Sequence, residues 1–319
     1  MNTGVKITAF AAALAATFGT AYGVGQGVGP VGEPVEAAHA EHAAAVEPDG
    51  GDGRAGHEES AVNTPAAGGL QVSAGGYTLA METPKPAQGK SVLKFSVKDA
   101  KGENLTSYAT EHGKELHFIV ASRDLTVYRH LHPVRAADGT WSTPVDLPDA
   151  GGYKAFADFR PAGKNAKGVT LGGDLSVPGA YAPRPLPAAA TTATVDGYEV
   201  GLGGGLAPGR AGELKLTVSK GGKPVADLEP YLGAYGHLVA LRDGDLAYLH
   251  VHPNEGGPGP EVSFTATAPS AGTYRLFLDF RHEGKVRTAA FTVHAGAGHA
   301  TAPAPTGTAT HDAGGHEHG

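Results

Sequence analysis

Short runs in which apolar and polar residues alternate recur through the middle of the chain, and Gly or Pro separates most of them. Such alternation is typical of strands that bury one face, and no segment shows a convincing helical period. About seven or eight of these runs follow one another between residues 69 and 178, among them SVLKFSVKD and ELHFIVA. The pattern predicts an all-β fold, an antiparallel sandwich, for residues 69–178.

The pattern then restarts after a linker rich in Pro and Ala at residues 179–191. The triplet Asp158-Phe159-Arg160 returns as Asp279-Phe280-Arg281, at an offset of about 120 residues. That period is too long for a solenoid repeat and suits a duplicated domain. We therefore expect a second sandwich at residues 192–295.

Each copy contains a Tyr two residues after a Gly at the start of a strand, in AGGYKA and AGTYRL. This resembles the tyrosine corner of immunoglobulin-like domains, in which the hydroxyl bonds the backbone a few residues upstream. Ala155 and Leu276 stand where those domains carry a Cys, and the chain has none. The prediction is two tandem immunoglobulin-like sandwiches without disulfides.

The ends of the chain have different compositions. Residues 1–28 carry one early Lys and an apolar, Ala-rich run, which predicts an export signal or an uncleaved N-terminal membrane anchor. Residues 29–68 form an acidic tether that contains His, and residues 296–319 form a His-rich tail, both expected to be disordered. The domains should therefore be extracytoplasmic, with membrane contact only through the N-terminal segment.

One histidine pattern occurs in both domains at identical spacing. The copies are His117, His130, His132 and His237, His250, His252, each closed by Pro, while most neighbouring residues differ. Residues two apart on a strand share a face, so each His-x-His pair presents both rings together. Asp243-Gly244 predicts a two-residue turn that would set His237 opposite His250. The hypothesis is one metal site per domain.

The Asp of each repeated triplet is the candidate fourth ligand, or an acceptor that orients a ring. The residues are Asp158 and Asp279, whose strands should lie beside those of His117 and His237. A structural Asp–Arg ion pair within each triplet is an equally weighted alternative. Tyr128 and Tyr248 share the histidine face and are candidates to hydrogen-bond a ligand, and we expect the unrepeated His112, His282 and His294 to be surface residues.

The C-terminal tail adds a cluster of imidazoles that we expect to collect metal weakly. Its members are His299, His311, His316 and His318. Imidazole suits Cu(II) and Zn(II), and no Met or Cys cluster favours Cu(I).

The histidine segment of the first domain, from His117 to Pro133, has the motif HxxVxxRDLxxYxHxHP. The signal segment, the His-rich ends and this motif resemble secreted actinobacterial proteins of uncharacterised function, and more distantly the YtkA-like extracytoplasmic β-sandwich domains. The resemblance implies metal handling outside the cell and supplies no ligands.

Charge and composition limit the function classes. A net charge of −7 argues against nucleic acid as partner, and no Gly-rich phosphate loop is present. We expect a non-enzymatic extracytoplasmic protein that binds Cu(II) or Zn(II) and loses it near about pH 6. The alternative is an interaction module for a cell-surface protein or polysaccharide with structural histidines. A metal-dependent hydrolase is less favoured, because no general base or nucleophile accompanies the histidines.

Overall fold

The computed structural model describes residues 67–249 and 251–296, which fall within one compact unit, Ser60–Gly319. The predicted signal, nearly all of the N-terminal tether, and the four tail histidines lie outside the described residues. No helix in the described part of the chain is long and apolar enough to cross a membrane.

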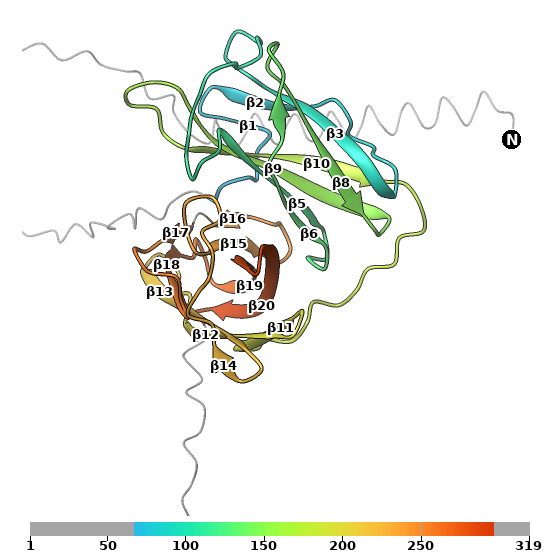
Figure 1. Ribbon diagram of the computed structural model, residues 1–319. Helices are drawn as coiled ribbons and strands as arrows, with labels where there is room; N and C mark the ends of the chain where they lie inside the picture. The colour runs from blue at the N-terminus through green and yellow to red at the C-terminus, as the bar shows by residue number, and fades with distance from the viewer. Residues whose placement is uncertain (1–66, 250, 297–319) are drawn as a thin grey trace, which may run out of the picture. The chain divides into compact units, whose positions relative to one another are not determined.

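The first domain is a sandwich of two antiparallel sheets (Figure 1). One sheet has the order β1 (Ser73–Ala74), β2 (Tyr77–Met81), β3 (Gly89–Lys98), β8 (Thr140–Leu147), β7 (Val134–Arg135). The other has the order β10 (Val169–Val177), β9 (Gly151–Pro161), β5 (Leu116–Ser122), β6 (Tyr128–Leu131), and β4 (Tyr108–Ala109) pairs with β9.

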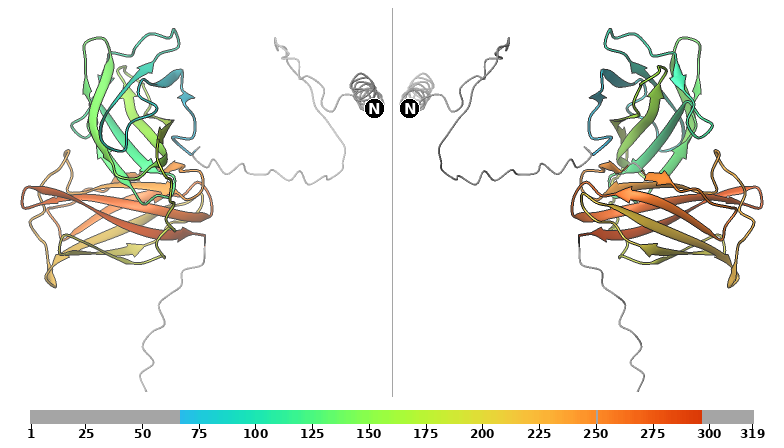
Figure 2. Two further views of the ribbon diagram at one scale, coloured as in Figure 1. Left: turned by 90° about the vertical axis from the view of Figure 1, so that its right-hand side faces the viewer. Right: turned by 90° about the vertical axis from the view of Figure 1, so that its left-hand side faces the viewer.

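The second domain, coloured yellow to red in Figure 2, repeats this arrangement. Its first sheet has the order β11 (Thr192–Val195), β12 (Tyr198–Gly204), β13 (Ala211–Lys220), β18 (Glu261–Thr267), β17 (Val251–Pro253), and β14 (Lys223–Pro224) pairs with β13. Its second sheet has the order β16 (Tyr248–Leu249), β15 (His237–Arg242), β19 (Gly272–His282), β20 (Lys285–Ala295). The predicted fold, two tandem immunoglobulin-like sandwiches, is confirmed.

The cores form where the alternation predicted. Phe95 of β3 stacks on Phe118 of β5 across the first sandwich, with ring centres 4.2 Å apart. The predicted tyrosine corners are present, since the Tyr153 hydroxyl donates to the Asp149 carbonyl (2.7 Å) and the Tyr274 hydroxyl to the Ser270 carbonyl (2.9 Å). Ala155 and Leu276, which replace the usual Cys, are fully buried, so apolar packing takes the place of an inter-sheet disulfide.

A third apolar cluster joins residues of both sandwiches. Phe156 and Phe277, which point away from their own cores, are buried in it, and Tyr128 stacks on Phe277 with ring centres 4.1 Å apart. These apolar neighbours bury the outward face of each sheet, which is the face that carries the histidines.

The β5–β6 and β15–β16 hairpins have four-residue loops rather than the predicted two-residue turn. Ser122 N–H donates to the Val127 carbonyl, and Arg242 N–H donates to the Ala247 carbonyl. Asp245 holds the wider loop by accepting the Ala247 N–H, which outweighs the turn preference of Asp243-Gly244. Pairing shifts by two residues, which preserves the face, but His130 lies opposite Ile119 instead of His117.

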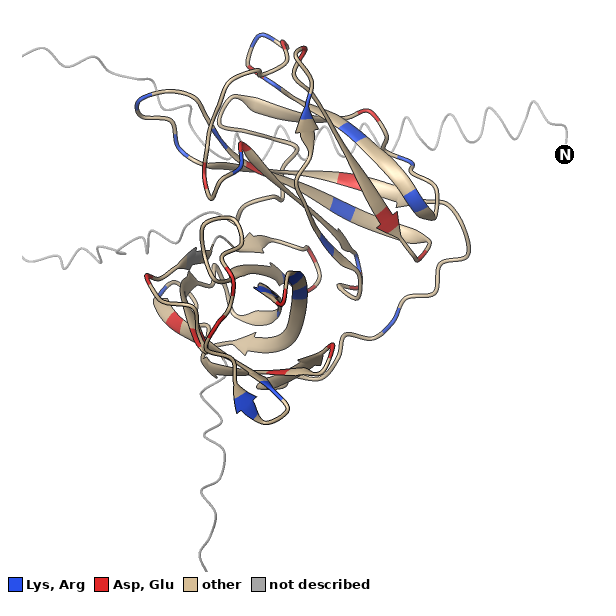
Figure 3. Ribbon diagram, viewed as in Figure 1, with Lys and Arg blue, Asp and Glu red and all other residues tan. Residues whose placement is uncertain are grey.

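Basic and acidic positions occur on both sandwiches (Figure 3).

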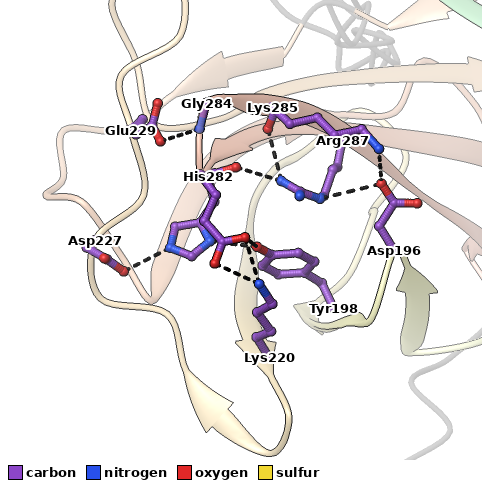
Figure 4. Close-up of polar contacts among 10 residues, drawn as sticks. Asp196, Tyr198, Lys220, Asp227, Glu229, His282, Gly284, Lys285 and Arg287 are labelled. Carbon is purple, nitrogen blue, oxygen red and sulfur yellow. Dashed lines mark hydrogen bonds and ion pairs between the residues drawn. The ribbon is translucent and has the colours of Figure 1, made fainter.

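At the β19–β20 turn, the His282 ring lies 2.7 Å from the Tyr198 hydroxyl and 3.1 Å from an Asp227 carboxylate oxygen (Figure 4). His282 is buried, so its expected place on the surface is wrong, whereas His294 is exposed as expected. The network fastens the turn to the neighbouring strands.

Candidate metal centre

His117, His130 and His132 converge in the first sandwich. His117 lies on β5, His130 on β6, and His132 follows β6 where the chain crosses to β7 in the opposite sheet. Each offers one ring nitrogen, and these three atoms lie within 4.8 Å of one another. All three residues are partly buried. The structure thus brings the first predicted triad together.

The ring spacing fits one tetrahedral cation. A metal–nitrogen bond of about 2.0–2.1 Å places a ring centre about 3.2 Å from the ion, so two ligating rings are about 5.2 Å apart. The observed separations are 5.3 Å for His117 and His130, 5.6 Å for His117 and His132, and 4.9 Å for His130 and His132. Little rearrangement is needed to enclose an ion.

Hydrogen bonds fix which nitrogens are free to ligate. His117 Nε2 lies 3.3 Å from the Glu111 carbonyl, which only accepts, so this nitrogen carries the proton. His130 Nδ1 lies 2.8 Å from an Asp279 carboxylate oxygen, which assigns its proton in the same way. His117 Nδ1 and His130 Nε2 then face each other at 3.1 Å, and in neutral rings both are acceptors. A cation or an added proton must lie between them.

His132 supplies independent support. Its Nε2 is buried and has no hydrogen-bond partner among the described residues. A buried polar atom without a partner costs about 1–3 kcal/mol, and a bound cation would remove this cost. The donor set, three imidazoles, suits Zn(II) and Cu(II).

Burial keeps the rings in the form that binds metal. Burial, together with neighbouring His130, lowers the pKa of His117 to about 3, and burial with His130 lowers that of His132 to about 4. Both rings are therefore neutral at ordinary pH. Protons therefore compete with a metal ion for these two rings only well below the pH of about 6 expected for unperturbed imidazoles.

The two predicted aspartates have different roles. Asp279 is a buried carboxylate of β19 that accepts from Thr288 Oγ1 at 2.5 Å and orients His130 of the other sandwich. Asp158 accepts from Thr170 Oγ1 at 2.9 Å, although its Cα lies opposite that of His117. Neither carboxylate belongs to the three-histidine group.

The tyrosines on this face contact these same carboxylates. Tyr128 and Tyr248 were candidates to bond a ligand, but their hydroxyls lie within 3.5 Å of Asp279 and Asp158, respectively. Each tyrosine thus reaches the carboxylate of the other sandwich.

The proposed Asp–Arg ion pair within each triplet is wrong. Arg160 pairs with Glu111 at 3.0 Å, and Arg281 pairs with Glu229 at 2.9 Å. Each arginine thus fixes the loop that precedes the β5 or β15 histidine.

Of the second triad, only the His237 side chain lies within the described residues. Its Nε2 donates to the Tyr231 carbonyl at 2.7 Å, and burial lowers its pKa to about 4. His250 lies outside the described residues, and for His252 only the backbone, paired with Thr265, is described. The second triad stays a prediction.

Sequence reasoning missed one neighbour. His112 is exposed, as expected, yet its ring lies 6.2 Å from that of His117 and 5.7 Å from that of His237. His112 sits in a short turn with φ of 50° and has no counterpart in the repeat, so no periodicity or spacing could have placed it.

Comparison with solved structures finds matches of low sequence identity and low TM-score. The chain is similar to the Lin-41 filamin domain (13% identity over 32% of this chain and 96% of that one, TM-score 0.22). It is also similar to the D0-D1 domain of intimin (10%, 67% and 96%, TM-score 0.20) and to domains 5-6 of the S-layer protein SbsC (14%, 68% and 96%, TM-score 0.22).

The curated proteins include no significant match to the chain. A family model described as a domain of unknown function, DUF8832, matches residues 71–168 and again residues 193–297, which together exceed half of the chain. The first match covers the first sandwich up to the start of β10, and the second match covers the second sandwich. The protein therefore belongs to the DUF8832 family and carries its domain in tandem.

Proposed function

We propose that this protein binds a divalent cation, Zn(II) or Cu(II), through His117, His130 and His132, and acts outside the cytoplasm without catalysing a reaction. The observation that carries the proposal is the 3.1 Å approach of His117 Nδ1 and His130 Nε2, two nitrogens whose partners leave them both as acceptors. The unpartnered Nε2 of His132 completes the set of donors.

Two features favour binding over catalysis. Two cavities among the described residues, of about 490 Å³ and 790 Å³, have walls that include His112 or Asp158 but no residue of the triad, so neither of these cavities opens onto the triad. Burial raises the pKa values of Tyr128 and Tyr248, beside the site, well above their usual range, so both hydroxyls stay protonated and cannot act as general bases. The metal-dependent hydrolase is therefore the weaker candidate.

The extracytoplasmic site of action rests on the sequence. The positively charged, apolar N-terminus and the acidic segment behind it are typical of export. The sequence resemblance to YtkA-like domains agrees with metal handling in that compartment. The His-rich tail would act as a weaker collector of the same ion.

A titration of the full chain with Zn(II) and Cu(II) tests the proposal. The histidines at both ends of the chain are replaced by Asn, so that only sites within the sandwiches are measured; they are His39, His42 and His57 of the tether and His299, His311, His316 and His318 of the tail. We expect at least one tightly bound equivalent, lost in the double variant His130→Ala/His132→Ala. The matched variant His250→Ala/His252→Ala removes the same residues from the second copy and reports on the predicted second triad.

The rival explanation of the histidine contact is a proton shared by His117 and His130. In that case the double variant would not change metal binding, and the sandwiches would be better understood as an interaction module. Unchanged binding in His130→Ala/His132→Ala with the tether and tail histidines replaced would therefore sink the proposal.

A further inference from the structure

Three imidazoles leave one position open on a tetrahedral ion, and the residues around the triad indicate what occupies it. The second sandwich turns two polar side chains toward the triad, His237 of β15 and Asp279 of β19. They are direct cross-strand partners, so they share a face of their sheet. Asp279 already contacts His130.

The His237 ring lies close to two ligands at once. Its centre is 6.2 Å from that of His130 and 6.3 Å from that of His117. These separations exceed the spacing of about 5.2 Å expected for rings on one tetrahedral ion by only about 1 Å. His237 is not a member of the group whose ligand atoms lie within 4.8 Å of one another, so its ring must turn toward the triad to bond the ion.

The hydrogen bonds of His237 match those of the proposed ligand His117. In both rings Nε2 donates to the carbonyl of the residue six positions earlier, Tyr231 or Glu111. Nδ1 of His237 is thereby left as an acceptor, as in His117. The residue is also 9% exposed, so its ring is already withdrawn from water.

His112 is the competing candidate, and its position is less suitable. It approaches His117 and His237, but it is exposed and lines the cavity of about 490 Å³ together with residues of the second sandwich. His237, in contrast, shares a neighbour with the triad, because the ring of Tyr231 packs edge-on against the rings of both His132 and His237.

We infer that His237 supplies the fourth ligand to the ion held by His117, His130 and His132, so that one metal ion links the two sandwiches. This inference rests on the proposed function and gives it a consequence: metal binding fastens the junction between the domains. The second sandwich then contributes both a direct ligand, His237, and the carboxylate that orients His130.

The absence of Cys from the chain allows a direct test. The variant His237→Cys places a single thiolate at this position. Because the proposed donor is Nδ1, the ring nitrogen nearer the backbone, and a metal–sulfur bond is about 2.3 Å against about 2.0–2.1 Å for nitrogen, the thiolate reaches almost as far. The probe is Co(II), added without oxygen to the full chain with the tether and tail histidines replaced.

A sulfur-to-cobalt charge-transfer band in His237→Cys, absent from the matched variant His112→Cys, is the expected result. Co(II) bound to His237→Cys without that band overturns the inference and leaves the proposed function intact. If the parent protein does not bind Co(II), or if His130→Ala/His132→Ala binds it as tightly as the parent does, the proposed function itself is refuted.

If His237→Cys does not fold, as judged by circular dichroism, the inference is tested on the parent protein instead. X-ray absorption at the zinc edge of the loaded parent counts the imidazole ligands. Four nitrogen-bound rings support the inference, and three rings with an oxygen ligand overturn it. His237→Ala, where folded, should weaken Zn(II) binding by at least the roughly 10- to 100-fold typical of losing a group that only orients a ligand.

Discussion

His130 Nδ1 of the first sandwich lies 2.8 Å from the Asp279 carboxylate of the second. Both side chains are almost fully buried, and the contact fixes the ring so that Nε2 points at His117. A carboxylate that orients a metal-binding imidazole raises its basicity and sets its tautomer. The candidate metal centre of the first domain is thus oriented by a residue of the second.

Replacing Asp279 should weaken metal binding without removing a ligand. In Asp279→Asn the side chain keeps its shape but no longer holds the charge that favours Nδ1–H on His130. We expect a loss of about 10- to 100-fold in Zn(II) affinity, measured by competition with a chelator. Asp158→Asn is the matched control, and an equal loss in both variants would show that Asp279 has no special relation to the triad.

The metal-free protein should lose stability in acid. Burial lowers the pKa values of His117 and His132 to about 3 and 4, whereas the unfolded chain titrates near about 6.5. Between these values the unfolded state binds more protons, so the free energy of unfolding rises with pH. Stability is therefore fully present above about pH 6.5 and declines as the pH falls toward about 4.

Urea denaturation of the metal-free protein across this range measures the effect. His132→Gln should show a shallower dependence on pH, and His294→Gln, at an exposed position, should match the parent. A free energy of unfolding that stays flat from about pH 6.5 to 4 would contradict the burial of neutral imidazoles.

The tyrosine corner should stabilise the second sandwich by an amount typical of one buried hydrogen bond. Tyr274→Phe deletes the hydroxyl that donates to the Ser270 carbonyl and leaves the ring in place. We expect a cost of about 0.5–1.5 kcal/mol in the free energy of unfolding. Tyr181→Phe, on the exposed linker, is the control, and equal stabilities of the two variants would refute the assignment.

Packing at the junction should support metal binding. Phe277 lies two residues before Asp279 on the same face of β19, and its ring stacks on Tyr128. The variant Phe277→Ala removes that ring. The expected cost is about 3–5 kcal/mol in stability, because a large buried side chain is truncated. Calorimetry should also show weaker Zn(II) binding, while Val134→Ala, at a position that is 73% exposed, should change neither quantity. An unchanged Zn(II) affinity in Phe277→Ala would show that packing at the junction does not support metal binding.

The sequence was sufficient for the fold and for the first triad, since alternation, repeat and His-x-His spacing are local properties. It could not reveal the junction. Phe156 and Phe277 are outward residues of their own sandwiches, and no local pattern shows that they are buried together. It also misassigned the register, because the Asp245 side chain organises a wider loop than the Asp-Gly pair alone favours.

The partners of Asp279 and His282 were beyond sequence reasoning for the same reason. Asp279 belongs by spacing to His237, its cross-strand neighbour, yet its carboxylate contacts His130 in the other sandwich. His282 has no repeated counterpart, and only the fold places it between Tyr198 and Asp227. Contacts between distant segments follow from tertiary packing, which periodicity does not encode.

Anomalous X-ray scattering from crystals of the zinc-loaded protein tests the central claim most directly. The account predicts a zinc peak about 2.0–2.1 Å from His117 Nδ1, His130 Nε2 and His132 Nε2. A structure from zinc-containing crystals with no peak there, and with His117 and His130 still in direct contact at 3.1 Å, would contradict it.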